Sequence, residues 1–417
     1  MKNIMKIAQK PFKSIYNCEV CGNTSLKPVL NLGMHPMCDD LVPVGNPRIC
    51  KEYPIEILYC NVCRTGHQKF QIPKEELFPK SYHYRSRFTA DVLSGMSGLV
   101  DSCLDKFGVL EKKTVLDIGC NDGSLLDFFK EKGAVTIGVE PTDASKDAEI
   151  KGHQIYSDYL SIDLAEKILK AHGHPEIITF TNVFAHIENL ASVLASLKVL
   201  QNTDTKIVIE NHYLGAVLDG NQFDTFYHEH PRTYSYTSFK FMAKTLGIDL
   251  EAVEFPSRYG GNIRVFMGMG SQLRSEQSLV ELDYNENLFE DQFDDLKLNI
   301  DKWLVSKKSI IKSIFDRCGK IRAKAFPGRS AILVKMLNVD EKTISAVYEK
   351  PGSLKIDHYV PGTRIPILSD DDLLASDNLE KPLLNLAWHI SKEIHEYIEK
   401  SGYSGTVINI LDTDDFG

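Results

Sequence analysis

Apolar and polar positions follow two different periods in the middle of the chain. Between about residues 85 and 268, short β-branched runs alternate with amphipathic stretches; the runs are TVLDIG, VTIGVE, IITFTN and KIVIEN. Strands that alternate with helices in this way form a parallel sheet covered on both faces. Near the end, IDLEAVEFP and NIRVFMGMG flank SRYGG, which predicts an antiparallel hairpin with a glycine turn. The pattern therefore predicts a Rossmann-like α/β domain over residues 81–270.

The regions on either side of this domain have different patterns. Residues 1–80 are rich in cysteine and turns and poor in helical periodicity. From residue 271 to about 322 the chain is polar and helical in pattern, and SAILVKML, TISAVYEK and TVINIL then resemble strands. The stretch LLNLAWHISKEIHEYIEKSG predicts an amphipathic helix ending at Gly402. We therefore expect a small N-terminal module in 1–80 and a second, Rossmann-like α/β domain in 271–417.

Composition excludes several classes of function. The chain has 417 residues, of which 43% are hydrophobic, and no apolar run reaches the roughly 18 residues of a membrane span. A net charge of -9 argues against nucleic-acid binding, which needs a concentrated Lys and Arg surface. The N-terminus lacks the apolar stretch and cleavage site of a secretory signal, so we expect a cytoplasmic protein. For the oligomeric state, we expect a monomer or a weak dimer.

Cysteines concentrate near the N-terminus, where six of the nine precede residue 64. Four of them form two C-x2-C pairs separated by 38 residues: Cys18, Cys21, Cys60 and Cys63. Two such pairs complete the tetrahedral four-thiolate site that zinc prefers, and a closed shell of this kind has a structural role. His35, Cys38 and Cys50 lie between the pairs without paired spacing, and we interpret them as ordinary buried or surface residues.

The stretch VLDIGCNDGSLLDFFKEKG has the pattern of a strand, a glycine turn and a helix. Gly119 and Gly123 allow a sharp turn and the close approach of a ligand to the backbone, while the helix N-terminus points into the same space. Asp117 ends the strand, and Glu140 follows the next strand, where a carboxylate accepts hydrogen bonds from ribose hydroxyls. Together with the final hairpin, this loop predicts a nucleoside-cofactor site of the kind found in S-adenosylmethionine-dependent methyltransferases.

The order of several motifs resembles one family. A paired-cysteine module, DIGCNDG, YHEH, YVPGTRIPI and LAWH follow one another along nearly the whole chain, as in the nucleotide-sugar C-methyltransferases of the tetronitrose C-methyltransferase type. Members act on 4-keto-6-deoxyhexoses linked to a nucleotide diphosphate. The resemblance implies a class I methyltransferase domain that binds S-adenosylmethionine, a structural zinc ion, and a C-terminal domain for the nucleotide-sugar substrate.

The resemblance also implies which residues bind the methyl donor. They are Asp117, Gly119, Asn121 and Gly123 near the methionine part, Glu140 on the ribose, Asp158 and Tyr159 near the adenine, and Asn182 on the floor of the site. For Asp158 a helix cap is an equal alternative.

A second set of residues matches the reacting centre of the family. The YHEH motif is complete as Tyr227, His228, Glu229 and His230, and VFAHIEN supplies His186. His230 corresponds to the general base, Tyr227 and Glu229 lie beside the sugar, and His228 is the least defined member. The Y-x-Y segment of the family's pocket matches SYHYRS, which leaves Tyr82 and Tyr84 as alternatives.

The C-terminal domain keeps part of the family's pattern. Tyr359, Thr363 and Trp388 follow it, and we expect them, with Arg329, to bind the substrate. The family's turn, close to G-Y-G-A-P-A-K-G, is replaced by AFPGRSAILVK, in which Ala331 stands at the lysine position. The nucleotide carrier is therefore left open.

Methylation of carbon requires a carbon nucleophile, which a ketone provides once a base removes the neighbouring proton. Histidine, with a pKa near ~6.5, suits this role at neutral pH. We therefore expect a C-methyltransferase that acts through an enolate. The alternatives are an O- or N-methyltransferase with the same donor, and a zinc scaffold that binds the donor without turnover.

Overall fold

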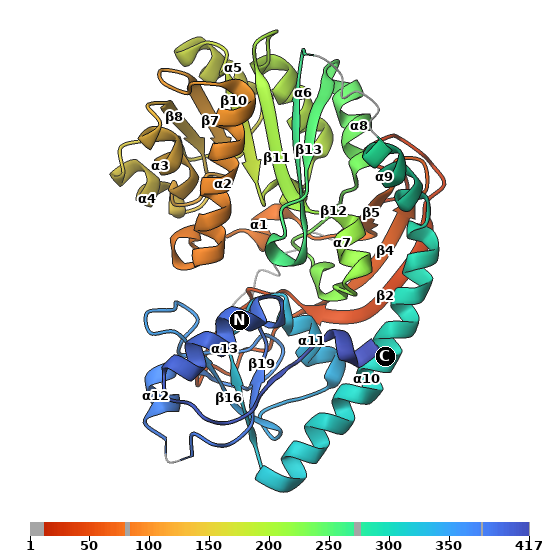
Figure 1. Ribbon diagram of the computed structural model, residues 1–417, viewed down its shortest axis with the longest axis vertical. Helices are drawn as coiled ribbons and strands as arrows, with labels where there is room; N and C mark the ends of the chain where they lie inside the picture. Colours follow the sequence, from red (N-terminus) through yellow and green to blue (C-terminus); the bar gives the residue numbers. More distant parts are fainter. Residues whose placement is uncertain (1–11, 80–83, 271–276, 377, 417) are drawn as a thin grey trace, which may run out of the picture.

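The computed structural model describes residues 12–79, 84–270, 277–376 and 378–416. Figure 1 shows an upper α/β domain, a lower α/β domain, and N-terminal strands beside them on the right. The long helix α10 (Phe289–Cys318) runs along the same side from the upper domain to the lower one. In the part of the chain that the structure describes, no helix is long and apolar enough to cross a membrane.

The upper domain is built on a seven-stranded sheet in the order β13-β14-β11-β10-β7-β8-β9. Its strands are β7 (Thr114–Ile118), β8 (Val135–Val139), β9 (Gln154–Tyr156), β10 (Ile177–Thr181), β11 (Lys206–His212), β13 (Asp249–Glu254) and β14 (Asn262–Gly268). All pairs are parallel except those of β14 with β11 and with β13. The predicted parallel strands and the antiparallel hairpin are thus confirmed, as is the class I methyltransferase fold.

Helices cover both faces of this sheet because successive strand residues point to opposite sides. Val115 and Ile177 pack with α2 (Ala90–Phe107) and α3 (Ser124–Glu131). Leu116 and Ile178 belong to the main core on the other face. That core includes residues of α5 (Ile162–His172), α6 (Leu190–Leu200) and α8 (Tyr236–Leu246).

The N-terminal module has more strand structure than its turn-rich sequence predicted. An antiparallel sheet has the order β12-β5-β4-β2, with β2 (Lys27–Pro36), β4 (Glu52–Cys60) and β5 (Thr65–Gln68) from the module. Its fourth strand, β12 (Arg232–Thr233), comes from the methyltransferase domain, directly after YHEH. The module therefore holds the segment that follows the predicted catalytic motif.

The lower domain contains a parallel five-stranded sheet in the order β18-β16-β15-β19-β20. Its strands are β15 (Ile321–Lys324), β16 (Ile344–Glu349), β18 (Ile367–Ser369), β19 (Leu383–Asn385) and β20 (Val407–Asn409). The polar helical region before it forms α9 (Gln277–Asn287) and α10. The prediction of a C-terminal α/β domain is confirmed in architecture.

Two predicted elements of this domain were wrong. SAILVKML is a helix, α11 (Ser330–Leu337), not a strand. It is buried at Ser330 through Val334, and a short helix buried all round lacks the polar face that would distinguish it from a buried strand. LLNLAWHISKEIHEYIEKSG divides into β19, a short 3-10 helix (Trp388–Ile390) and α13 (Ser391–Lys400).

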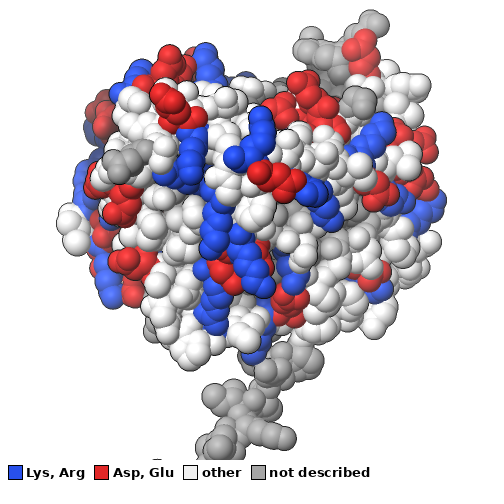
Figure 2. All heavy atoms as spheres, turned by 90° about the horizontal axis from the view of Figure 1, so that it is seen from below, with Lys and Arg blue, Asp and Glu red and all other residues white. Residues whose placement is uncertain are grey.

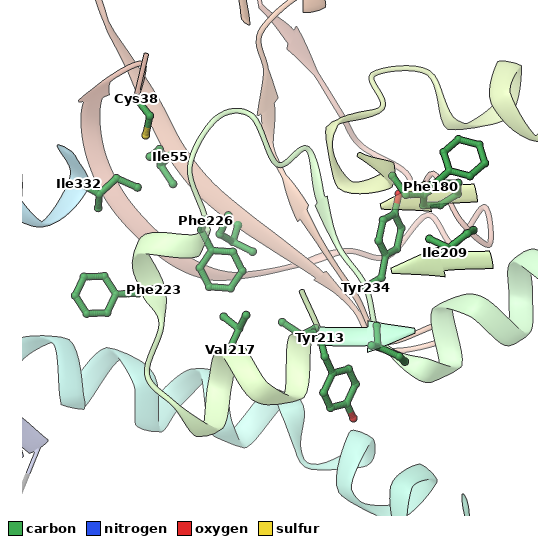
Figure 3. Close-up of a cluster of buried hydrophobic side chains, with 14 of the residues drawn as sticks. Cys38, Ile55, Phe180, Ile209, Tyr213, Val217, Phe223, Phe226, Tyr234 and Ile332 are labelled. Carbon is green, nitrogen blue, oxygen red and sulfur yellow. The ribbon is translucent and has the colours of Figure 1, made fainter. Parts of the chain in front are cut away.

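A shared apolar core joins the three regions. Figure 3 shows Phe223 and Phe226 on the segment before YHEH, with Ile55 of β4 and Ile332 of α11 nearby. Phe223 also packs edge-on against Trp303 of α10, with ring centroids 5.0 Å apart. The segment that leads into the predicted catalytic motif therefore packs against all three regions.

Charges of both signs are mixed on the face seen in Figure 2. Lys and Arg side chains gather along its middle, with Asp and Glu beside them. A mixed arrangement of this kind gives no extended basic surface on that face.

Candidate active site

One large cavity, of about 740 Å³, lies where the methyltransferase domain, the N-terminal module and the C-terminal domain meet. Its walls include the carboxyl ends of β7, β8, β10 and β11, residues after β2, and loops after β15, β16 and β19. In parallel sheets, ligands bind outside the carboxyl ends of the strands, at the point where the strand order reverses. Both α/β domains present such an edge to this cavity.

The glycine loop forms the donor end of the cavity. Gly119 and Asn121 line it, and both adopt left-handed backbone conformations, with φ of 73° and 50°. A Cβ at Gly119 would lie 2.6 Å from two side-chain carbons of Val183, so the loop requires glycine there. The carboxylate of Glu140 accepts hydrogen bonds from the backbone N–H groups of Asn121 (3.0 Å) and Thr142 (2.9 Å). Glu140 is thus held at the cavity wall in the position that binds ribose in nucleoside sites.

Asp117 lies under this loop, and Thr179 donates a hydrogen bond of 2.7 Å to its carboxylate. Burial, with a contribution from Glu140, raises the pKa of Asp117 to about 7. Asn182 follows β10, lines the cavity and also has a positive φ, of 54°. Both side chains lie at the cavity, where an S-adenosylmethionine sulfonium or amino group would find polar partners.

The remaining predicted donor residues divide into two groups. Asp158 and Tyr159 line the cavity, whereas Gly123 does not and instead caps α3. The cap of α5 is Ser161, so the helix-cap interpretation of Asp158 is wrong. Lys74 stacks its ammonium group over the ring of Tyr159, 3.9 Å from its centroid.

The histidine cluster forms the middle of the cavity. The Nδ1–H of His230 donates to the carbonyl of Thr225 (3.0 Å), which leaves Nε2 as the unprotonated nitrogen of a neutral ring. Burial and the neighbouring His186 and His212 lower the pKa of His230 well below its usual value. His230 is therefore a neutral imidazole at pH 7 with one nitrogen available to accept a proton.

Two rings, those of Tyr227 and His186, lie against that of His230. Tyr227 has its ring centroid 4.1 Å from that of His230, with the planes tilted by 40°, and burial raises the pKa of Tyr227 well above 10, so its phenol keeps its proton. The centroid of His186 lies 4.8 Å from that of His230, and its Nδ1–H donates to the carbonyl of Glu229 (2.7 Å). Burial lowers the pKa of His186 to about 4. Tyr227, Glu229, His186 and His230 all line the cavity.

Other predicted catalytic residues are placed differently. His228 does not line the cavity: its Nε2–H donates to the carbonyl of Tyr53 in the N-terminal module (3.1 Å), so we correct its assignment to a structural contact. Tyr84 lines the cavity and is 41% exposed. Tyr82 lies outside the described residues.

The predicted substrate residues of the C-terminal domain do not form one group. Arg329 lines the cavity. Trp388 does not; its Nε1–H donates to Asp224 (2.9 Å). Tyr359 pairs with Val42 in a two-stranded sheet, and the hydroxyl of Thr363 donates to the carbonyl of Val360 (2.8 Å), both away from the cavity. Tyr359 therefore joins the C-terminal domain to the module, Thr363 stabilises a turn within its own domain, and neither lines the cavity.

Several cavity residues were missed in the sequence. Ser86 lines the cavity, and its backbone N–H donates to the side chain of Asn121 (3.0 Å), which holds Ser86 against the glycine loop. The others are His212 at the end of β11, His389, Cys38, Lys350 and Lys355. As isolated residues they carry no motif; only their position at strand ends could have suggested them.

The four predicted cysteines come together as a metal site. Their sulfur atoms lie within 4.8 Å of one another, with Cys18 to Cys63 at 3.3 Å and Cys21 to Cys60 at 3.6 Å. A Zn–S bond of about 2.3 Å in tetrahedral geometry requires sulfur atoms roughly 3.8 Å apart, so this donor set fits zinc.

Three family models match consecutive parts of the chain. They are "Putative zinc binding domain" over residues 18–78, "Methyltransferase domain" over 84–253 and "C-methyltransferase C-terminal domain" over 257–409. Among curated proteins, the C-methyltransferase NovU of Streptomyces niveus is 24% identical over 413 residues, which cover 94% of each chain.

Other similarities cover only part of the chain. The ubiquinone biosynthesis O-methyltransferase of Pseudomonas paraeruginosa is 30% identical over 95 residues, 22% of this chain and 40% of that one. Among solved structures, the PH0226 protein of Pyrococcus horikoshii is 14% identical, with a TM-score of 0.36, over 46% of this chain and 97% of that one. The three domain matches, together with the similarity to NovU over nearly the whole chain, indicate the class of enzyme. The chain is therefore an S-adenosylmethionine-dependent methyltransferase, similar to a C-methyltransferase over nearly its whole length, that combines a zinc-binding module, a methyltransferase domain and a C-methyltransferase C-terminal domain.

Proposed function

We propose that this enzyme methylates a carbon next to the keto group of a nucleotide-linked 4-keto-6-deoxy sugar, through an enolate formed by His230. The observation that carries the proposal is the state of His230 in the cavity. Its ring is neutral, its Nδ1–H is fixed by a carbonyl, and its Nε2 is the nitrogen whose lone pair can accept a proton. A neutral histidine is suited to removing the proton next to a ketone.

The other residues of the cavity have roles that follow from their protonation. When that C–H bond breaks, its proton goes to Nε2 of His230 and the electron pair moves toward the ketone oxygen. Tyr227, which keeps its phenolic proton, can donate a hydrogen bond to the developing enolate oxygen. Glu229 and His186 complete the walls around the sugar. S-adenosylmethionine supplies the methyl group that the resulting carbon nucleophile takes.

The C-terminal side of the cavity suits the nucleotide diphosphate. Lys350 and Lys355 from the loop after β16 line it, and their positive charges favour a polyanionic ligand. Gly328 and Arg329, directly before α11, line the same side of the cavity. A sugar carried on a nucleotide held there extends toward His230 in the methyltransferase domain. Two ends of one substrate would thus be held by two domains.

A panel of 4-keto-6-deoxy sugars with different nucleotide carriers tests the proposal. Each is incubated with enzyme and S-adenosylmethionine, and the products are analysed by mass spectrometry. A gain of one methyl group on one member identifies both the substrate class and the carrier. Fragment ions that place the methyl group on oxygen or nitrogen would instead support an O- or N-methyltransferase. Calorimetric binding of the donor with no methylated product across the panel would support a non-catalytic scaffold.

A further inference from the structure

Asp224 is a fully buried carboxylate at the boundary between the two α/β domains. Its Oδ2 accepts hydrogen bonds from Arg329 Nε (2.9 Å) and Trp388 Nε1 (2.9 Å), and its Oδ1 accepts one from Arg329 Nη2 (2.6 Å). Both partners belong to the C-terminal domain. Asp224 itself does not line the cavity. Arg329 and Trp388, which the sequence predicted to bind substrate, therefore donate these hydrogen bonds to a carboxylate of the methyltransferase domain.

The residue after Asp224 holds the base. Asp224 and Thr225 share a short 3-10 turn (Phe223–Thr225), and the carbonyl of Thr225 accepts the Nδ1–H of His230. This bond determines which ring nitrogen carries the proton and where the other nitrogen points. The orientation of that carbonyl depends on the adjacent peptide, which the three hydrogen bonds to Asp224 immobilise. A continuous chain of bonds thus runs from the C-terminal domain to the base.

We propose that Asp224 is a positioning residue, through which Arg329 and Trp388 of the C-terminal domain fix the tautomer and orientation of His230. The inference rests on the proposed function for its catalytic consequence. The positioning itself is a property of the free protein.

A positioning role explains the buried charge of Asp224 better than packing between the two domains does. A buried carboxylate is costly unless it is paired, and apolar side chains would join two domains at least as stably. Figure 3 shows Phe223 and Phe226, which flank Asp224 and Thr225 in the chain, within the shared apolar core. Because these two rings keep their apolar contacts, removing the charge of Asp224 should leave the fold intact and change only the orientation of the peptides between them.

The variant Asp224→Asn keeps the size of the side chain but loses its charge and one acceptor oxygen. Asp415→Asn is a matched control, because Asp415 forms an equally buried ion pair with Lys307 (2.9 Å) and does not line the cavity. Trp388→Phe removes only one donor to Asp224 and should give an intermediate effect. Unfolding curves for the three variants measure the purely structural cost.

Nitrogen-15 NMR of histidine-labelled protein reads the tautomer without any substrate. The wild-type enzyme and Asp415→Asn should show His230 protonated at Nδ1, whereas Asp224→Asn should show both tautomers. An unchanged His230 signal in Asp224→Asn would overturn the proposal. This result is independent of whether the substrate assignment is correct.

Kinetics measure the catalytic consequence. With the sugar identified by the product panel, Asp224→Asn should lower kcat about 10- to 100-fold with little change in KM, because displacement of a reacting group by ~1 Å costs up to about that factor. Asp415→Asn should keep the wild-type kcat. A rise in KM at constant kcat, or equal losses in the two variants, would overturn the positioning role. Absence of any carbon methylation by wild-type enzyme would refute the proposed function, and the tautomer measurement would still decide the role of Asp224.

Discussion

The glycine loop allows a sharp test of how the donor site is built. In Gly119→Ala, the new methyl group would lie 2.6 Å from Cγ1 and Cγ2 of Val183, and the backbone would keep a φ of 73°. Two separate costs follow from this change. One is the strain of a left-handed conformation, and the other is a contact far below the usual van der Waals separation.

The two costs can be given magnitudes. A left-handed residue other than glycine costs roughly 1–2 kcal/mol. Carbon atoms at optimal contact are about 3.5–4.0 Å apart, so the loop and Val183 must separate by roughly 1 Å. A shift of that size moves the loop that lines the donor end of the cavity. We expect S-adenosylmethionine to bind at least about tenfold more weakly, which corresponds to ~1.4 kcal/mol.

Gly247→Ala separates strain from contact. Gly247 caps α8 with a φ of 74°, and nothing lies within 4 Å of a Cβ placed there. Urea unfolding should show a loss of roughly 1–2 kcal/mol in the free energy of unfolding for Gly247→Ala and at least as much for Gly119→Ala. Calorimetry should show weaker donor binding for Gly119→Ala alone. Equal donor affinities in the two variants would refute the assignment of Gly119 to the donor site.

Two further predictions concern pH and zinc. Burial lowers the pKa of His186 to about 4 and that of His212 to about 3, both below the value near 6.5 of an unfolded chain, so protons bind preferentially to the unfolded state below that pH. The free energy of unfolding should fall as pH decreases below about 6.5, because these histidines and the buried His67 and His228 outnumber Asp117, whose pKa of about 7 has the opposite effect. Urea unfolding at pH 7.5 and 5.5 tests this, and greater stability at pH 5.5 would contradict it. Removal of zinc by a chelator should lower the melting temperature and the rate of carbon–hydrogen exchange together, because β5 of the module pairs with β12 directly after YHEH. A chelated enzyme, shown by metal analysis to lack zinc, that keeps its melting temperature would contradict a structural role for the metal.

The sequence predicted the parts of the fold that depend on local patterns. The parallel strands, the final hairpin and the cysteine pairs all have strong short-range signals, and each is confirmed. Helix α11 was mistaken for a strand because Ser330 through Val334 are buried on every side, which removes the periodicity that identifies a helix. The contact between the methyltransferase domain and the N-terminal module could not be predicted either, because β12 joins a sheet whose other strands lie more than 150 residues earlier in the chain.

The same difference between local patterns and long-range contacts applies to the candidate site. Contiguous motifs indicated Glu140, Tyr227 and His230, which all line the cavity. Contacts between domains have no local signal. The pairing of Asp224 with Arg329, more than 100 residues away in the chain, could not be seen in the sequence. The resemblance suggested that Trp388 binds substrate, whereas it donates a hydrogen bond to Asp224.

Solvent exchange tests the central claim most directly. Enzyme and the accepted sugar are incubated in deuterium oxide without S-adenosylmethionine, and deuterium at the carbon next to the ketone is followed by NMR. Only a carbon methyltransferase that forms an enolate should catalyse this exchange. We predict exchange by the wild-type enzyme and a loss of about 10²- to 10⁴-fold in His230→Ala. Exchange at the wild-type rate in that variant would contradict the assignment of His230 as the base, and the absence of exchange in the wild-type enzyme would contradict the enolate mechanism.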